Sequence, residues 1–199
     1  MLPHPTIHSV QKECDDFDKD DFTKNSEQAL SQLIAAFPQN TDVSQVLSKV
    51  IVLDQLYSTR IRYVDLLPFA RHIVASNVDS PIEVGSPKAV ELIWDCKETR
   101  QYYSFATKFC SWHNPAAYPI YDHYVDESLW AYKQQDSFYS FHRQDLYDYE
   151  KFVNIVTEFK LSYGLESFSV RDIDKFLWNV GYQLLSKNAD AATDARATS

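Results

Sequence analysis

Apolar side chains recur at every third or fourth position along most of the chain, which is the period of an amphipathic helix. The strongest run starts at Thr41 or Asp42, after which the segment VSQVLSKVIVLDQLY is apolar almost all round and predicts a central core helix. Pro38 is expected to end the helix before it, and Gly164 is expected to end a later, long helix. The expected helices cover residues 25–37, 42–57, 64–76, 87–97, 99–113, 123–133, 147–163 and 170–185.

This pattern predicts an all-α fold with one packed core. Three glycines in 199 residues are too few for a β protein rich in tight turns, and the chain length suits a single compact domain. We therefore expect one helical domain over residues 25–186, with a mobile acidic arm at 1–24 and a disordered tail at 187–199. The expected core centres on Val46, Val50, Leu53, Phe105, Phe109, Leu177 and Trp178.

The composition argues against several classes of function. No glycine-rich phosphate loop is present, so nucleotide-driven chemistry of the common kinds is not expected. Cys14, Cys96 and Cys110 have no histidine or cysteine at metal-binding spacing, which predicts reduced cysteines, no metal and no cofactor. The sequence has neither a signal-peptide pattern nor an apolar window long enough for a membrane span, so we expect a cytoplasmic protein and a monomer.

Charge is unevenly distributed along the chain. The net charge of −9 disfavours binding to nucleic acid. Residues 1–48 carry 3 basic and 8 acidic side chains (net −5), and residues 134–199 carry 7 and 10 (net −3). Residues 49–133 carry 9 and 10 (net −1), so the central segment is nearly neutral. We expect it to hold a basic, phosphate-binding surface. The basic residues expected to share this surface are Arg60, Arg62, Lys97, Arg100 and Lys108.

The segment richest in candidate chemistry is YYSFATKFCSWHNPAAYPIYDHYV, residues 102–125. It predicts a helix, a proline-containing link and a second helix opened by Asp122. One carboxylate oxygen can cap that helix while the other faces a cleft, although an aspartate at a helix start is often only a cap. Aromatic and histidine side chains that can stack on a flat polar ligand are concentrated around it, with core packing as the alternative for each aromatic. They are Trp112, His113, Tyr121, His123 and Tyr124.

This segment resembles the catalytic half of the helix-hairpin-helix DNA glycosylases, the superfamily of endonuclease III and 8-oxoguanine DNA glycosylase. Ser104–Cys110 parallels a helix of the pattern K-T-A-x-ø-ø, and IYDHYV at residues 120–125 parallels the ø-D-x-H-ø motif with the catalytic aspartate. Ser104 and Asp122 are 122 − 104 = 18 residues apart, as lysine and aspartate are in the endonuclease III branch. Residues 49–61 and 170–181 resemble segments of bacterial proteins with an oxoguanine-glycosylase fold, so the resemblance covers roughly residues 26–185.

The sequence departs from that superfamily in two places. The glycine-containing hairpin that donates backbone N–H groups to DNA phosphates is replaced by CKETRQYY, residues 96–103. Lys97 and Arg100 lie in its place and are candidates to take over its phosphate contacts. The position of the nucleophilic lysine is occupied by Ser104, and Lys108 lies one helical turn later. A lysine nucleophile forms a Schiff base with the sugar, so its loss implies an enzyme that uses water instead.

The resemblance implies a monofunctional DNA glycosylase that removes a damaged or modified base, for which a modified base of phage DNA is one possibility. Asp122 would be the catalytic carboxylate, because positive charge develops on the deoxyribose as the N-glycosidic bond breaks. Lys108 is a second catalytic candidate, and Ser104 and the side chains around Asp122 are candidates for substrate binding. The alternative is a non-catalytic helical binding module that kept the fold and lost the chemistry. The missing lysine, the missing hairpin and the negative charge favour that alternative.

Overall fold

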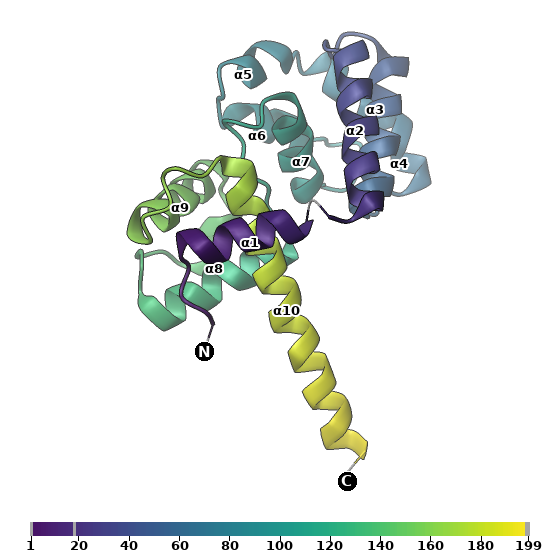
Figure 1. Cartoon of the computed structure of the whole chain (residues 1–199). Coiled ribbons are helices and arrows are strands. Elements are labelled where there is room, and N and C mark those ends of the chain that lie inside the picture. Colours follow the sequence, from purple (N-terminus) through teal and green to yellow (C-terminus); the bar gives the residue numbers. More distant parts are fainter. Residues whose placement is uncertain (1, 18, 198–199) are drawn as a thin grey trace. The chain divides into compact units, whose positions relative to one another are not determined.

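The computed structural model describes residues 2–17 and 19–197, with side chains as far as Lys187. The all-α fold expected from the sequence is confirmed, because the described residues form helices and none of them lies in a strand (Figure 1). The helices are α1 (Ile7–Phe17), α2 (Asp21–Ala36), α3 (Val43–Tyr57), α4 (Tyr63–Ala75), α5 (Asp79–Glu83), α6 (Lys88–Trp94), α7 (Tyr103–His113), α8 (His123–Asp136), the 3-10 helix η1 (Arg143–Tyr147), α9 (Tyr149–Ser162) and α10 (Val170–Ala197).

The contacts of the chain cluster into two compact units. Unit 1 comprises residues 1–17 and 121–199, and therefore contains α1, α8, η1, α9 and α10. Unit 2 comprises residues 18–120 and contains α2 to α7. Each unit has its own buried apolar side chains, so the two are described separately.

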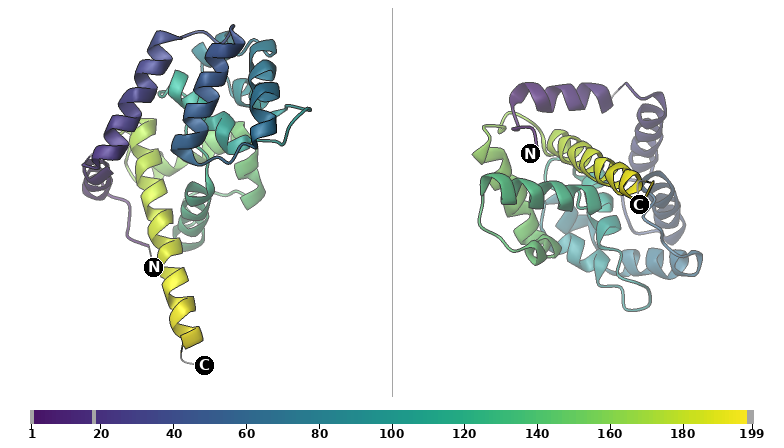
Figure 2. Two further views of the ribbon diagram at one scale, coloured as in Figure 1. Left: turned by 90° about the vertical axis from the view of Figure 1, so that its right-hand side faces the viewer. Right: turned by 90° about the horizontal axis from the view of Figure 1, so that it is seen from below.

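Unit 2 is built around α3, which packs against α2, α4 and α7 (Figure 2). Val46, Val50 and Leu53 are fully buried on α3, as its apolar pattern predicts. Phe105 and Phe109 of α7 are buried with them, so the core expected for this part of the chain is confirmed. Helix α7 is surrounded on nearly all sides, because eight of its eleven residues are buried.

Unit 1 is organised by α10, which packs along α8 and is crossed by α1 (Figure 1). Leu177 is buried as expected, and its carbonyl oxygen accepts a hydrogen bond of 2.5 Å from the Ser128 hydroxyl of α8. Trp178, predicted as a core residue, is only half-buried. Its indole therefore lies at the edge of the unit, where it belongs to an aromatic cluster described below.

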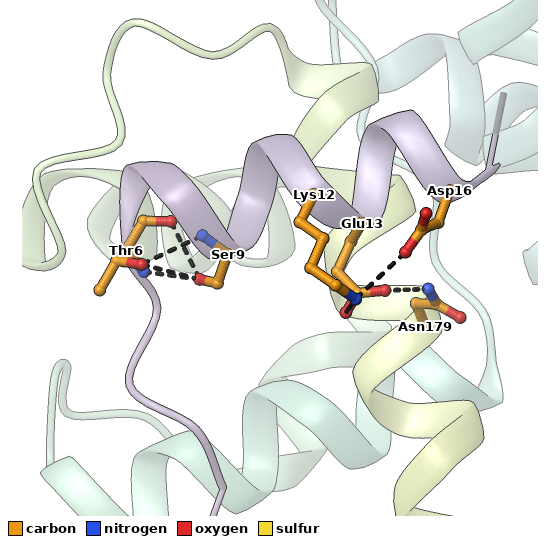
Figure 3. Close-up of polar contacts among 6 residues, drawn as sticks. All are labelled: Thr6, Ser9, Lys12, Glu13, Asp16 and Asn179. Atoms are coloured by element: carbon orange, nitrogen blue, oxygen red, sulfur yellow. Dashed lines mark hydrogen bonds and ion pairs between the residues drawn. The ribbon is translucent and has the colours of Figure 1, made fainter.

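The prediction of a mobile acidic arm is wrong for residues 2–17, which form α1 and its lead-in. The helix begins with reciprocal hydrogen bonds, from Ser9 N to Thr6 Oγ1 (3.1 Å) and from Thr6 N to Ser9 Oγ (2.9 Å) (Figure 3). Val10 and Cys14, one turn apart, are buried, so α1 has an apolar face that its acidic composition conceals. The Asn179 amide of α10 donates a hydrogen bond to Glu13, which ties the other flank of α1 to the unit (Figure 3).

Helix boundaries follow the capping residues, and one of these was misassigned. Asp42 caps α3 as predicted, accepting from Gln45 N at 2.9 Å. Helix α2 is instead capped at Asp20, five residues before the expected start at residue 25, because Asp20 accepts from Thr23 N at 2.7 Å. Gly164 ends α9 with a φ of +65°, the left-handed conformation that favours glycine.

Two further segments differ from their predicted boundaries. The short helix α5 lies within residues 77–87, where the pattern indicated only a loop. Helix α10 continues to Ala197, although its side chains are described only as far as Lys187. The disordered tail expected at 187–199 therefore stays a prediction. No described helix is long and apolar enough to cross a membrane.

Candidate functional site

Asp122 opens α8, and its carboxylate caps the helix as the sequence predicts. An extended backbone (φ −150°, ψ 179°) leads into the helix, and Asp122 Oδ1 accepts a hydrogen bond of 3.0 Å from Val125 N. The side chain is half-buried, so it is held by the helix without being sealed in the core. The positive potential of a helix N-terminus also favours a carboxylate at this position. Asp122 is thus a fixed negative charge at the edge of unit 1.

An aromatic cluster of unit 1 lies where α10 crosses the first turn of α8, the turn that Asp122 caps. Gly181 makes this crossing possible, since a Cβ atom there would lie 2.0 Å from the carbonyl oxygen of Tyr124. Trp178 and Tyr182 flank the glycine and stack with ring planes 4° apart and centroids 5.4 Å apart. Tyr124 meets them edge-on, at 5.3 Å from Trp178 and 5.6 Å from Tyr182. We call Tyr124, Trp178 and Tyr182 the aromatic cluster.

The aromatic cluster is open to solvent on one side. Tyr182 is 47% exposed, Tyr124 and Trp178 are half-buried, and the neighbouring His123 is exposed. Among these, Tyr124 and His123 were candidates from the sequence, while Tyr182 was missed and Trp178 was assigned to the core. The i, i+4 spacing of Trp178 and Tyr182 on a helix was the available signal. A stacked, partly exposed pair of this kind can receive a flat aromatic ligand.

Tyr121, the other predicted aromatic next to Asp122, lies in the core of unit 1. Its hydroxyl donates to Asp126 Oδ2 at 3.0 Å, and burial raises the pKa of this phenol, which therefore stays protonated and donates. Arg143 forms ion pairs with Asp126 Oδ1 at 2.5 Å and with Glu127, so the charge of the buried Asp126 carboxylate is balanced by a guanidinium. This polar group fixes the link before α8, and a direct role of Tyr121 in substrate binding stays a prediction.

Three predicted residues of α7 lie on one face of that helix, in unit 2. Lys108 Nζ donates to Ser104 Oγ at 2.6 Å, one turn earlier, and lies 5.5 Å from the centre of the Tyr57 ring. Trp112 Nε1 donates to the Tyr57 hydroxyl at 2.9 Å. Lys108 is only 2% exposed, so the expectation that it forms part of an exposed basic surface is wrong. Its stem is enclosed because α7 is buried almost all round.

His113 lies on a different face of α7 and contacts a buried lysine that the sequence analysis missed. Lys49 is 0% exposed, and its ammonium donates to Gln39 O (3.0 Å), Asn40 Oδ1 (2.8 Å) and His113 Nε2 (3.3 Å). His113 Nδ1 donates to Phe109 O at 2.8 Å, which leaves Nε2 as the acceptor for Lys49. Burial lowers the pKa of His113 from 6.5 to about 4 and that of Lys49 from 10.5 to about 8. A lysine within an apolar helix was the only local signal.

Apart from Lys108, the residues predicted to form the phosphate-binding surface differ in what they contact. Arg62 forms a two-pronged ion pair with buried Asp65, at 2.7 Å for each pair of atoms, and Asp65 also accepts from the Tyr102 hydroxyl and the Arg100 backbone. These contacts lower the pKa of Asp65 to about 2, the Arg62 hydrogen bonds being the main cause. Lys97 pairs with Asp95 next to it. Arg60 and Arg100 expose their side chains.

The predicted site residues are thus divided between the units. Unit 1 holds Asp122 with the aromatic cluster, His123 and Tyr121, and unit 2 holds the α7 residues and the basic candidates. Among the side chains that the structure describes, no three histidine, cysteine, aspartate or glutamate residues are grouped as a metal site requires. In unit 1, the carboxylate of Asp122 precedes Tyr124 of the aromatic cluster by two residues.

Comparison with known proteins identifies relatives without describing an activity. A family model named HI_0787_N, described as an N-terminal domain, matches residues 9–117, which include all of α2 to α7. An uncharacterized protein of Haemophilus influenzae is 32% identical over 156 residues, which cover 75% of this chain and 72% of that protein. No solved structure shows a significant match to the chain.

Proposed function

The chain belongs to the HI_0787_N family, and we propose that this member is a monofunctional DNA glycosylase that hydrolyses the N-glycosidic bond of a damaged or modified base. The observation that carries the proposal is the start of α8, where Asp122 is fixed as the cap of the helix turn that contains Tyr124 of the aromatic cluster. The resemblance of the IYDHYV segment to the glycosylase motif assigns the catalytic role to the same residue.

The chemistry follows from what a fixed carboxylate does for a breaking glycosidic bond. As the base leaves, positive charge develops on the deoxyribose, and a negative group held in place stabilises it without reorganising. The same carboxylate can orient and deprotonate the water that completes the hydrolysis. The extruded base needs a flat apolar surface, and the aromatic cluster can offer one at the first turn of α8, which Asp122 caps. The proposed substrates are damaged or modified bases of DNA, and they include the modified bases of phage DNA.

Water, and not an amine, is the proposed nucleophile. Lys108 is buried, and its Nζ is hydrogen-bonded to Ser104. In the resemblance to the helix-hairpin-helix DNA glycosylases, Ser104 stands at the position of the lysine that strand-cleaving enzymes carry. A buried, hydrogen-bonded ammonium is a poor Schiff-base nucleophile, because it must both lose a proton and reach the sugar. Excision should therefore leave an intact abasic strand.

A second candidate is a binding module without catalysis. It is favoured by the ion pairs that occupy two of the predicted phosphate-binding side chains, since Arg62 is held by Asp65 and Lys97 by Asp95. The net charge of −9 acts in the same direction. In that case the fold would bind a partner while Asp122 served only as a cap.

The test is excision from DNA duplexes that carry different damaged or phage-type modified bases, followed by alkali to reveal abasic sites. Asp122→Asn keeps the cap but removes the charge, so excision should slow at least ~100-fold, which corresponds to ~3 kcal/mol of lost transition-state stabilisation. Asp42→Asn is the matched control, because Asp42 caps α3 with the same kind of hydrogen bond, to the backbone N–H three residues later, and this variant should excise normally. Borohydride should trap no covalent adduct.

Two outcomes would contradict this proposal. Equal excision by the Asp122→Asn and Asp42→Asn proteins would remove Asp122 from the chemistry. Excision of no base in the panel, by a protein that still binds DNA, would favour the binding module.

A further inference from the structure

An exposed apolar and basic surface lies where α3 leads into α4. Tyr63 at the start of α4 is 89% exposed, which is exceptional for a tyrosine, and Val64 and Leu67 are exposed beside it. Arg71 is exposed two turns further along the same helix face, and Arg60 is exposed in the loop before it. We call Arg60, Tyr63, Val64, Leu67 and Arg71 the α4 corner.

The exposed charged residues of α3, α4 and the loop between them are all basic, although the protein as a whole is acidic. Within the described residues 44–75, the exposed charged residues are Arg60, Arg62 and Arg71. The two acidic residues of the stretch are occupied internally. Asp54 accepts from Thr59 Oγ1 (2.6 Å) and from Ile61 N (3.0 Å), and Asp65 is buried against Arg62. The α4 corner is therefore complementary to a polyanion.

The loop that presents the α4 corner is held in an uncommon conformation. Ser58 and Arg60 have φ values of +49° and +61°, although neither is a glycine. The bonds to Asp54 fix the first half of the loop, and Arg62 N donates to the Tyr102 hydroxyl at 3.2 Å. Backbone strain of this kind persists only where surrounding contacts enforce it. Arg60 and Tyr63 are thus presented in a preorganised arrangement, so binding need not order the loop.

We propose that the α4 corner binds a DNA strand that has accessible bases, with Arg60 and Arg71 on phosphates and Tyr63 stacked on a base. Arg62 acts differently, because its guanidinium is held by Asp65 and supports the loop. Guanidinium groups bind phosphates through charge-assisted hydrogen bonds, and an exposed aromatic ring stacks on any base. The choice of DNA over an acidic polypeptide rests on the proposed function, and the test separates the two.

The first measurement is fluorescence anisotropy with a labelled single-stranded oligonucleotide and the paired duplex of the same sequence. The Arg60→Ala, Arg71→Ala double variant should bind the single strand at least about tenfold more weakly at low salt. Its slope of log affinity against log salt should fall by about 1.4, because each phosphate contact on a single strand contributes about 0.7. A Lys24→Ala, Lys88→Ala double variant removes the same charge from exposed positions of the same unit and should bind normally.

The second measurement concerns Tyr63. Tyr63→Ala should weaken single-strand binding about 5- to 100-fold, while Tyr63→Phe should stay within about twofold of the wild type, because stacking needs only the ring. Polyglutamate should compete poorly. The proposal is overturned if the two double variants bind alike, if Tyr63→Ala has no effect, or if polyglutamate displaces the DNA at equal charge concentration.

Failure of this inference is distinguishable from failure of the proposed function. If the α4 corner variants lose binding to single-stranded DNA and neither the wild type nor any variant excises a base, the α4 corner is supported as a DNA-binding surface and the proposed glycosylase activity is refuted. Normal excision together with normal binding in those variants would refute the surface alone.

Discussion

The contact between His113 and Lys49 predicts a specific loss of stability in acid. At neutral pH the unprotonated Nε2 of His113 accepts from the Lys49 ammonium, while Nδ1 donates to Phe109 O. Protonation would place two donors face to face in a buried site, which is consistent with the pKa of His113 falling from 6.5 to about 4 on burial. Above pH 6.5 the histidine is neutral in both folded and unfolded chains. Between pH 6.5 and pH 4 only the unfolded chain takes up the proton, so the folded state loses stability as pH falls through this window.

The size of the effect follows from the same two values. The interval of 2.5 between 6.5 and about 4, at about 1.4 kcal/mol per pKa unit, gives an upper limit of about 3 kcal/mol. His113→Gln replaces Nε2 with an amide that can still accept from Lys49 but does not titrate. The free energy of unfolding of the wild type should therefore fall by up to about 3 kcal/mol more than that of His113→Gln between pH 7 and pH 4.

Urea unfolding followed by circular dichroism at several pH values measures this difference. His8→Gln is the control, because His8 is exposed on α1 and its removal should leave the acid loss unchanged. Parallel pH profiles for the wild type and His113→Gln would refute the reasoning, since they would show that neutral His113 contributes nothing. A profile in which His8→Gln alone removed the acid loss would refute it equally.

Two further predictions concern packing and the buried ion pair. Gly181→Ala should destabilise the protein by at least about 2 kcal/mol, because its Cβ would overlap the Tyr124 backbone. Gly164→Ala should cost only about 1 kcal/mol, for its left-handed backbone. Equal losses of stability for the two variants in thermal unfolding would contradict this prediction. Asp65→Asn should lower the melting temperature at pH 7, because Arg62 and Tyr102 then lose a charged partner. The advantage of the wild type over this variant should be present above about pH 4 and should be lost as pH falls towards 2. A melting temperature that is the same for both proteins at pH 7 would show that the Asp65 contacts are not stabilising.

The parts of the fold that the sequence predicts are those set by local interactions. Asp42 and Asp122 are recognisable as caps because the hydrogen bond joins residues three apart, and the apolar face of α3 is contained within one segment. Helix α1 was not predicted because it packs on α10, more than 150 positions away, where Cys14 Sγ contacts the backbone carbonyl of Asp172. An acidic composition describes its exposed face only.

The candidate site shows the same limit. Lys49 looked like any basic residue of a helix, and its acceptors come from the chain at Asn40 and His113, which no local pattern connects. Lys108 was expected on a surface because of its charge, yet α7 is enclosed in unit 2. The spacing of Trp178 and Tyr182 is a local signal, but the edge-on contact of Tyr124 with both rings depends on the close approach of α10 to α8 at Gly181, which only the tertiary arrangement supplies.

The pairing of α1 with α10 sets an order for the formation of the molecule during synthesis. Unit 2 is one continuous stretch of chain and can complete its core as soon as residues 18–120 have left the ribosome. Helix α1 emerges earlier, but its partner surface is made more than 150 residues later, so Val10 and Cys14 remain without their native cover in the meantime. Helix α1 is thus synthesised before unit 2 but fixed in place after it.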